Sequence, residues 1–263
     1  MRVEWALGAI LVAGCDVVWS IDHVGDPTDD AANPSTCKQG DHDEDHDAVP
    51  DACDRCPGIS DDQRDTDDDS VGDMCDPSGS TRDKLALFVS FAEPPTNWHT
   101  LVGSWPSDGD SLSYDSITLN NYGVTLYTGV VPDPPYVFEV HFAIESIDAQ
   151  VSAFGVLFDA DPSGQGAGCD LDRQATMDVI RASDVDSMPS AEAVLTPFRP
   201  GGYRIVTKYD RNGAIECSVR SDDSTIVGGV PTPLTPAPAP GTLGFRSFRV
   251  GVRVHYLALY QTY

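Results

Sequence analysis

Hydrophobic and polar positions alternate along most of the chain after residue 84. In residues 136–145 every second residue is apolar, and most of the positions between them are charged or polar. A period of two indicates a β-strand with one buried face. The apolar face of this run consists of Tyr136, Phe138, Val140, Phe142 and Ile144. A run near the C-terminus predicts a second long strand, with Phe248, Val250, Val252, Val254 and Tyr256 on one face.

Shorter runs of the same kind predict strands at 85–91, 123–128, 151–159, 203–209 and 214–220. Part of 174–194 is the one stretch whose pattern suits an amphipathic helix. Residues 230–241 are rich in proline. Since the residues after them are too few to form their own core, we expect a stiff loop within the domain. Many short strands with Gly and Pro turns predict an all-β fold, an antiparallel jelly-roll sandwich.

The N-terminus has the features of an export signal. Residues 5–14 are apolar, but this run is shorter than the about 20 residues that span a bilayer, and it suits a secretory signal. The sequence LVAGC at 11–15 resembles the lipobox of bacterial lipoproteins. The resemblance implies cleavage before Cys15, lipidation of Cys15 and anchoring of the mature chain to a membrane. The alternative is a buried helix with a chance cysteine.

The expected location is the bacterial cell envelope. An outer-membrane or surface position is favoured, with the inner membrane as the alternative, because Asp16 follows the lipidated cysteine. If Cys15 carries lipid, six of the seven cysteines remain, an even number that suits disulfides in an exported protein. They are Cys37, Cys53, Cys56, Cys75, Cys169 and Cys217. Cys169 and Cys217 lie on separate strand-like segments, and we expect them to pair, with free thiols as the alternative.

Negative charge is concentrated in one short segment. The chain has a formal net charge of -26. Residues 41–76 contain fifteen Asp and Glu against two Arg, so half of the excess lies there. Acidity on this scale argues against nucleic-acid binding, because phosphates are repelled. Its concentration in one segment indicates a local device, such as a set of divalent-cation sites.

Two parts of the acidic segment superimpose at a spacing of 22 residues. Counted from Asp43 or Asp65 as position 1, acidic residues occupy positions 1, 3, 5, 9 and 12 of both repeats. Calcium takes six to eight oxygen ligands, and an EF-hand loop supplies them from positions 1, 3, 5, 7, 9 and 12, using a backbone carbonyl at position 7. The predicted calcium ligands are Asp43, Asp45, Asp47, Val49, Asp51, Asp54, Asp65, Asp67, Asp69, Val71, Asp73 and Asp76.

The stretch CPGISDDQRDTDDDSVGDMCD at 56–76 resembles the thrombospondin type 3 repeat. The resemblance covers about 36 residues and implies irregular, disulfide-stapled loops that bind Ca²⁺. It also implies the pair Cys56–Cys75, which leaves Cys37 and Cys53 to pair with each other. This chain departs from the family at position 6, where Ala48 and Ser70 replace the usual glycine, so we expect weakened sites. The alternatives are a disordered acidic linker and a zinc site that involves His42 and His46.

The C-terminal region resembles concanavalin A-like (laminin G-like) domains. The resemblance rests on NW at 97–98, GSW at 103–105, FGVLF at 154–158, the strand–turn–strand at 203–219 and GTLGFR at 241–246. It implies binding of glycans or proteins, although some members are glycoside hydrolases. Trp98, Trp105 and Tyr122 are candidates for a sugar-stacking platform, with core packing as the alternative.

The residues argue against an enzyme. The ExDxE motif of hydrolases with this fold is absent, because His141 and Ala143 stand between Glu139 and Glu145. Four other acids, Asp159, Asp161, Asp170 and Asp172, are expected to be solvated loop residues. No Ser/His/Asp or Cys/His arrangement has supporting context.

These observations predict a signal peptide at 1–14, a tether at 15–36, calcium-binding repeats at 37–76, a linker at 77–84 and a sandwich at 85–263. The expected function is that of a lipid-anchored envelope protein. Calcium loops would form a rigid stalk, and a lectin-like head would bind glycans or cell-surface proteins in adhesion. The alternatives are a lipid-anchored hydrolase of polysaccharides and a purely structural envelope protein.

Overall fold

The computed structural model describes residues 42–93, 95–115, 122–175, 177–183, 189–195, 197–212, 214–233 and 242–263. The chain divides into two compact units, Met1–Ala31 and Ala32–Tyr263, and the first unit lies outside the described residues. The predictions for the signal peptide, Cys15, the tether and Cys37 therefore fall outside them as well. Among the segments that are described, none is a helix with the length and hydrophobicity of a membrane span.

The described part of the chain is built almost wholly from strands, as the alternating pattern predicts. One 3-10 turn, η1 (Asp51–Cys53), precedes them. The strands are β1 (Lys84–Val89), β2 (Trp98–Val102), β3 (Leu112–Tyr114), β4 (Tyr122–Tyr127), β5 (Tyr136–Ile147), β6 (Ser152–Ala160), β7 (Ala167–Gln174), β8 (Met177–Ser183), β9 (Pro189–Leu195), β10 (Gly201–Tyr209), β11 (Ala214–Ser221), β12 (Val227–Pro233), β13 (Thr242–Phe248) and β14 (Val250–Gln261).

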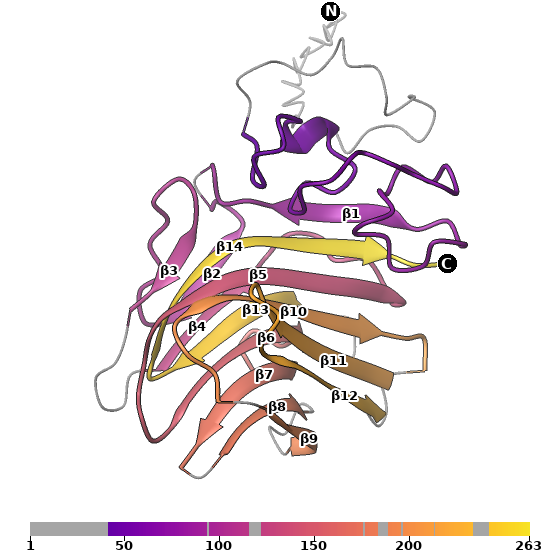
Figure 1. Cartoon of the computed structure of the whole chain (residues 1–263). Helices are drawn as coiled ribbons and strands as arrows, with labels where there is room; N and C mark the ends of the chain where they lie inside the picture. The colour runs from indigo at the N-terminus through magenta and orange to yellow at the C-terminus, as the bar shows by residue number, and fades with distance from the viewer. Residues whose placement is uncertain are drawn as a thin grey trace, which may run out of the picture. The chain divides into compact units, whose positions relative to one another are not determined.

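Two antiparallel sheets form a sandwich (Figure 1). Sheet A has the order β1-β14-β5-β10-β11-β12, with β3 also paired to β14, and sheet B has the order β2-β4-β13-β6-β7-β8-β9. Consecutive strands are neighbours in β6-β7-β8-β9 and in β10-β11-β12, whereas β13 lies between β4 and β6 and β14 lies between β1 and β5. This arrangement confirms the predicted all-β, antiparallel jelly-roll fold.

The core lies between the sheets and is rich in aromatic residues. The predicted apolar face of β5 points into it, and Phe138, Val140 and Phe142 are fully buried. Phe142 of sheet A meets Phe154 of sheet B with ring centroids 4.4 Å apart. The Cys169–Cys217 disulfide, with its Cα atoms 5.8 Å apart, joins β7 to β11 and so ties the two sheets together.

Two predictions of local structure were wrong. Residues 177–183 and 189–195, within the stretch assigned to a helix, form β8 and β9. Val179 and Ile180 point to opposite faces and are both fully buried, so this strand lacks the simple alternation that would reveal it. The predicted face of the last strand also breaks, because its register shifts between Val254 and Tyr256. Such a β-bulge turns Tyr256 away from the main core.

The proline-rich stretch differs in part from the expected loop. Residues 230–233 belong to β12, which pairs with β11 at the end of sheet A. An edge strand tolerates proline because one side of its backbone needs no ladder partner. Residues 234–241 lie outside the described residues.

The acidic segment packs against the outer face of sheet A (Figure 1). Val71 is 1% exposed and lies in a second apolar cluster with Val137, Tyr256, Ala258 and Tyr260. Arg204 donates a hydrogen bond to the carbonyl of Gly58 over 3.0 Å. A side chain at position 58 would collide with the Tyr256 ring. The segment is therefore a cover on the sandwich rather than the free stalk that we expected.

Candidate functional site

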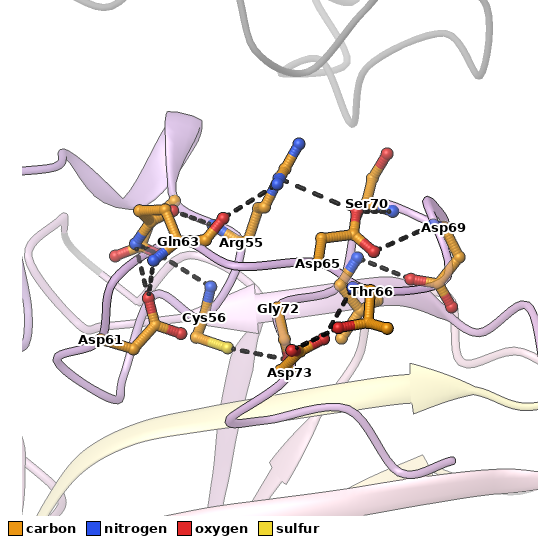
Figure 2. A network of polar contacts seen from close by, with 12 residues as sticks. Arg55, Cys56, Asp61, Gln63, Asp65, Thr66, Asp69, Ser70, Gly72 and Asp73 are labelled. Carbon is orange, nitrogen blue, oxygen red and sulfur yellow. Dashed lines mark hydrogen bonds and ion pairs between the residues drawn. The ribbon is translucent and has the colours of Figure 1, made fainter. Parts of the chain in front are cut away.

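The two aspartate repeats fold into loops of the same local structure. Asp43 accepts hydrogen bonds from the backbone of His46 and Ala48. In the second loop Asp65 accepts from the backbone of Asp69 and Ser70 (Figure 2). The backbone turns sharply at position 6 of each loop, where Ala48 and Ser70 both have φ of 78°. Left-handed backbone is the conformation for which glycine is preferred. Ala48 and Ser70 therefore strain the backbone at position 6, as expected from residues that replace the usual glycine there.

Three alternate carboxylates converge in each loop. Oxygens of Asp43, Asp45 and Asp47 lie within 4.8 Å of one another, and those of Asp65, Asp67 and Asp69 do the same. Every second side chain therefore points to one centre, as the spacing predicts. We call these two sets the inner groups.

A further group links the first loop to the chain that follows it. Oxygens of Asp47, Asp54 and Asp61 lie within 4.8 Å of one another. The amide nitrogen of Gln63 lies 3.1, 2.7 and 3.1 Å from oxygens of Asp47, Asp54 and Asp61, so its two N–H groups are shared among the three carboxylates. Figure 2 shows its contact with Asp61. The orientation of that amide follows from its oxygen, which accepts from the Arg55 backbone. One buried oxygen each of Asp54 and Asp61 has no hydrogen-bond partner, so these oxygens are available to a cation.

The second repeat places Asp69, Asp76 and Asp83 at the same spacing. Asp83 is 3% exposed, and neither of its carboxylate oxygens has a hydrogen-bond partner. Its backbone N–H donates to Asp69 over 2.5 Å. Burial, followed by the carboxylates of Asp76 and Asp69, raises the pKa of Asp83 to about 6. We call Asp47–Asp54–Asp61 and Asp69–Asp76–Asp83 the outer groups.

Sequence reasoning missed Asp61 and Asp83. Asp83 fell within the stretch assigned to a linker, and Asp61 falls between the two loops. The signal was present, since Asp61 and Asp83 are separated by the same 22 residues as Asp43 and Asp65. Comparison beyond position 12 of the repeat would have found them.

The aspartates at position 9 have another role in the described geometry. Asp51 accepts from the backbone N–H of Glu44, and Asp73 accepts from that of Thr66, both at position 2. Asp51 also bonds His42, while Asp73 pairs with Arg64 at 3.1 Å. Asp51 thus joins position 9 to position 2 in the first loop, and Asp73 does the same in the second. The carbonyls of Val49 and Val71 remain predicted ligands.

The loops hold much uncompensated negative charge. Burial is the largest cause that raises the pKa of Asp45 and of Asp54 to about 6 in each case. Neighbouring aspartates add to the shift of Asp45. Carboxylates that are buried together without counter-charges favour protonation or a bound cation.

Disulfides staple the loop segment. The Cys56–Cys75 pair forms, with its Cα atoms 5.6 Å apart, as the resemblance implied. Cys53 is disulfide-bonded, and Cys37, its expected partner, lies outside the described residues. Cys56 is fully buried, and the crosslink joins the chain before the second loop to the end of that loop.

The sandwich carries a hollow on the outer face of sheet B. Its volume is about 210 Å³. Strand pairing sets Arg246, Gly155, Asp170 and Arg181 side by side across four strands. The next row brings Tyr122, Phe248, Ala153 and Asp172 together in the same way. The lining residues are Tyr122, Ala153, Asp170, Asp172, Arg181, Ser183, Arg246, Ser247 and Phe248.

Ion pairs organise the polar half of this hollow. Arg246 forms a two-pronged pair with Asp170, and Gly155 leaves room for it, because a Cβ there would collide with the Asp170 carboxylate. Arg181 pairs with Asp172 over 2.6 Å. Asp170 and Asp172 are 4% and 7% exposed. The prediction that these two acids are solvated loop residues was wrong, since both lie on β7 and point into a charged array.

The three aromatic candidates do not share one surface. Trp105 is 7% exposed and stacks on Tyr114 with ring centroids 4.7 Å apart. Trp98 stacks on Phe245 of the core at 4.9 Å. Tyr122 alone lines the hollow, where it is 41% exposed beside Phe248. The structure thus places Trp98 and Trp105 in or against the core, the alternative that the sequence left open.

Glu139 and Glu145, the two acids compared with the hydrolase motif, both form ion pairs with arginines. Glu139 accepts from Arg204 over 3.0 Å and from the Tyr256 hydroxyl over 2.6 Å. Glu145 pairs with Arg253 over 2.9 Å. A general acid or nucleophile needs a carboxyl that can exchange its proton or attack, and these two are engaged in fixed ion pairs.

No family model and no curated protein matches the chain by sequence. Solved structures share its fold. The CBM2 module of the evolved Dit of Lactobacillus casei BL23 phage J-1 is similar with a TM-score of 0.52 and 11% identity, over 68% of this chain and 96% of that one. Winged bean acidic lectin, complexed with methyl-α-D-galactose, gives 0.51 and 13% over 67% and 98%.

The exoplasmic/lumenal domain of VIP36, in a Ca²⁺- and Man3GlcNAc-bound form, gives a TM-score of 0.53 and 11% identity over 65% of this chain and 85% of that one. These likenesses establish a lectin-like, concanavalin A-like jelly roll for the sandwich. At such low identity they concern the fold alone, and function has to be argued from the sites themselves.

Proposed function

We propose that this protein is a calcium-binding, lectin-like module in which each aspartate loop binds two Ca²⁺ ions and the hollow of sheet B binds a glycan. The observation that carries the calcium proposal is the convergence of both inner groups and of the first outer group, with buried oxygens of Asp54 and Asp61 that lack a hydrogen-bond partner. In the second repeat Asp83 has the same spacing, and Asp76 and Asp69 act on its carboxylate. Asp47 and Asp69 belong to both groups of their repeats and would bridge the two ions.

The ligand chemistry suits calcium. The inner and outer groups consist of carboxylates alone, which are the hard oxygen donors that Ca²⁺ prefers. A single divalent ion cannot neutralise the five carboxylates that each pair of groups assembles. Two ions per loop leave each loop close to neutral. One structure of similar fold, the exoplasmic/lumenal domain of VIP36, is in a Ca²⁺-bound form, which supports the proposal by analogy.

Calorimetry tests the calcium proposal. We expect up to four Ca²⁺ ions per chain, and Asp83→Asn should remove at least one of them. Asp62→Asn is the matched control, because Asp62 is exposed and lies in none of the groups. An unchanged stoichiometry in the Asp83 variant, or no calcium binding by the wild type, would refute the two-ion loops.

The glycan proposal rests on the hollow. Asp170 and Asp172 present carboxylates that accept from sugar hydroxyls, while Arg181 and Arg246 present donors in a fixed array. The ring of Tyr122 offers an apolar face at the edge. Binding sites for small ligands combine such apolar walls with a few oriented polar groups. The hollow is open and small, which suits a single sugar unit of a longer chain.

A glycan array in calcium tests this site. Wild-type protein should bind a defined set of glycans, and Tyr122→Ala should weaken binding at least tenfold. Tyr263→Ala removes an exposed aromatic residue at the C-terminus and serves as control. Equal binding by both variants would exclude the hollow. Parallel assays on polysaccharides address the hydrolase alternative, because turnover would overturn a binding role.

We propose further that Cys15 anchors the protein to a bacterial membrane. The support is the sequence at 11–15 alone. Mass spectrometry of the mature N-terminus should find acyl chains on Cys15, and Cys15→Ser should release the protein from the membrane fraction. Adhesion to a cell-surface protein or glycan then follows as the role of the anchored module.

A further inference from the structure

A separate polar cluster lies where the loop segment meets the sandwich. His42 comes from the start of the described loop segment, and Asp110 comes from the turn before β3. The Nε2 atom of His42 lies 3.9 Å from Oε2 of Glu44 and 3.9 Å from Oδ1 of Asp110. Neither Glu44 nor Asp110 belongs to the inner or outer groups.

The His42 ring is held in one orientation. Its Nδ1 atom lies 2.8 Å from the Asp51 carboxylate, which fixes that nitrogen as the donor. The lone pair of the neutral ring is then on Nε2, which faces Glu44 and Asp110. A carboxylate that orients a histidine in this way is the usual second partner of a metal-binding imidazole.

Glu44 provides the second, independent observation. Its side chain is 8% exposed, and its buried Oε2 atom has no hydrogen-bond partner. Other carboxylates surround it, among them Asp51 and Asp110. The one nearby imidazole is already engaged with Asp51. Apart from the 3.9 Å approach of His42 Nε2, this buried carboxylate oxygen has no partner, and buried polar atoms usually have a hydrogen bond.

We propose that His42, Glu44 and Asp110 bind a zinc-class divalent cation, distinct from the calcium ions of the loops. Nitrogen and oxygen ligands together suit Zn²⁺, which takes three protein ligands and a water molecule in open sites. Bonds of about 2.0–2.1 Å in a tetrahedron place ligand atoms about 3.4 Å apart. The two 3.9 Å separations from His42 Nε2 are only a little longer than this. The three ligand atoms do not all lie within 4.8 Å of one another, so the Asp110 side chain has to move toward Glu44 on binding.

The cation would join the loop segment to the sandwich. Asp110 is 70% exposed, so its side chain is free to swing toward the metal. His42 and Glu44 belong to the first loop, which lies far in sequence from Asp110. A metal at this point is a crosslink between the two regions, and it would limit the motion of the first loop over sheet A.

Zinc titration of the calcium-saturated full chain tests the proposal. Saturating Ca²⁺ fills the loops, so calorimetry then reports other sites. We expect one Zn²⁺ per chain, with at least tenfold weaker binding in His42→Ala and in Glu44→Gln. His46→Ala is the matched control, because His46 is exposed in the same loop and outside the cluster. Asp110→Asn tests the ligand from the sandwich and should also weaken binding.

Three results would overturn the site: no saturable Zn²⁺ binding, equal binding in the His42 and His46 variants, or a Co²⁺ absorption spectrum of six oxygen ligands. Circular dichroism in calcium shows whether each variant folds, and Glu44→Gln preserves the shape of the side chain if His42→Ala does not fold. Calcium calorimetry on the same variants keeps the outcome separate from that of the loops.

Discussion

The loop segment and the sandwich are ordered by different forces. Between residues 42 and 83 the buried apolar residues include Cys56 and Val71, and many hydrogen bonds there join carboxylates to backbone N–H groups. The sandwich buries a large core between two sheets. Apolar burial stabilises a fold under any ionic condition, whereas clustered carboxylates oppose folding until a cation neutralises them. If the proposed calcium sites are filled, the loop segment depends on calcium for its order, whereas the sandwich does not.

Removal of calcium is the strongest way to test this difference. With a chelator, repulsion within the inner and outer groups should disorder residues 42–83, while the sandwich keeps its fold. We expect rapid proteolysis confined to that segment and little change in the strand signal of circular dichroism. Hydrogen exchange measures both regions in one experiment. Equal protection of the loops with and without calcium would contradict it.

A substitution in the core of the sandwich should lower stability whether or not calcium is present. Phe142 is fully buried and packs on Phe154 across the two sheets. Phe142→Ala should lower the free energy of unfolding by about 3–5 kcal/mol. The loss should be similar in calcium and in chelator, because the affected contacts lie in the sandwich. Chemical denaturation under both conditions measures it, and a loss that appears only in calcium would mean that the regions do not fold independently.

The contact between the two regions can be broken at Gly58. A Cβ atom there collides with the ring of Tyr256, and Arg204 also reaches the Gly58 carbonyl. Overpacking of this kind costs about 1–3 kcal/mol. Gly58→Ala should therefore loosen the loop segment from sheet A without unfolding the sandwich. Gly79→Ala is the control, since the nearest atom to its added Cβ is at 3.7 Å.

The sequence predicted much of the sandwich and the inner groups, for a physical reason. Alternation is visible wherever one face of a strand is buried, as on β5. It fails on β8, where Val179 and Ile180 are both buried, and at the bulge before Tyr256. The aspartates at positions 1, 3 and 5 converge because neighbours in a loop are fixed by local backbone geometry.

The hollow and the cover on sheet A were beyond sequence reasoning. The hollow joins Tyr122, Asp170 and Arg246, which come from three strands that are distant in sequence. Their proximity depends on the order of β4, β13, β6 and β7 in sheet B, which no local pattern encodes. Gly58 likewise carries no mark of its contact with Tyr256. Asp83 was different, because the 22-residue repeat did encode it.

A fall in pH should stabilise the loops of the calcium-free protein and destabilise those of the calcium-loaded protein. Folding raises the pKa of Asp45, Asp54 and Asp83 from 3.8 to about 6. In chelator, where we expect the loops to be disordered at pH 7, their folded form binds protons more readily than their unfolded form. The stability of the folded loops therefore rises as pH falls through about 6 toward 4. In calcium the protons displace the cations, and stability falls. Thermal unfolding at pH 5 and 7 in both solutions checks this, and a common direction would contradict it.

The smallest expected effect concerns the strained turns. Ser70 adopts φ of 78° at position 6 of the second loop, a conformation that costs about 1 kcal/mol for a residue with a side chain. Ser70→Gly relieves this strain, although the more flexible unfolded chain offsets part of the gain. We expect calcium affinity to rise by up to about fivefold, since 1 kcal/mol corresponds to that factor. Calorimetry of Ser70→Gly beside Ser78→Gly, a serine outside the loops, measures it. A weaker calcium site in Ser70→Gly would show that the serine contributes more to the loop than its strain removes.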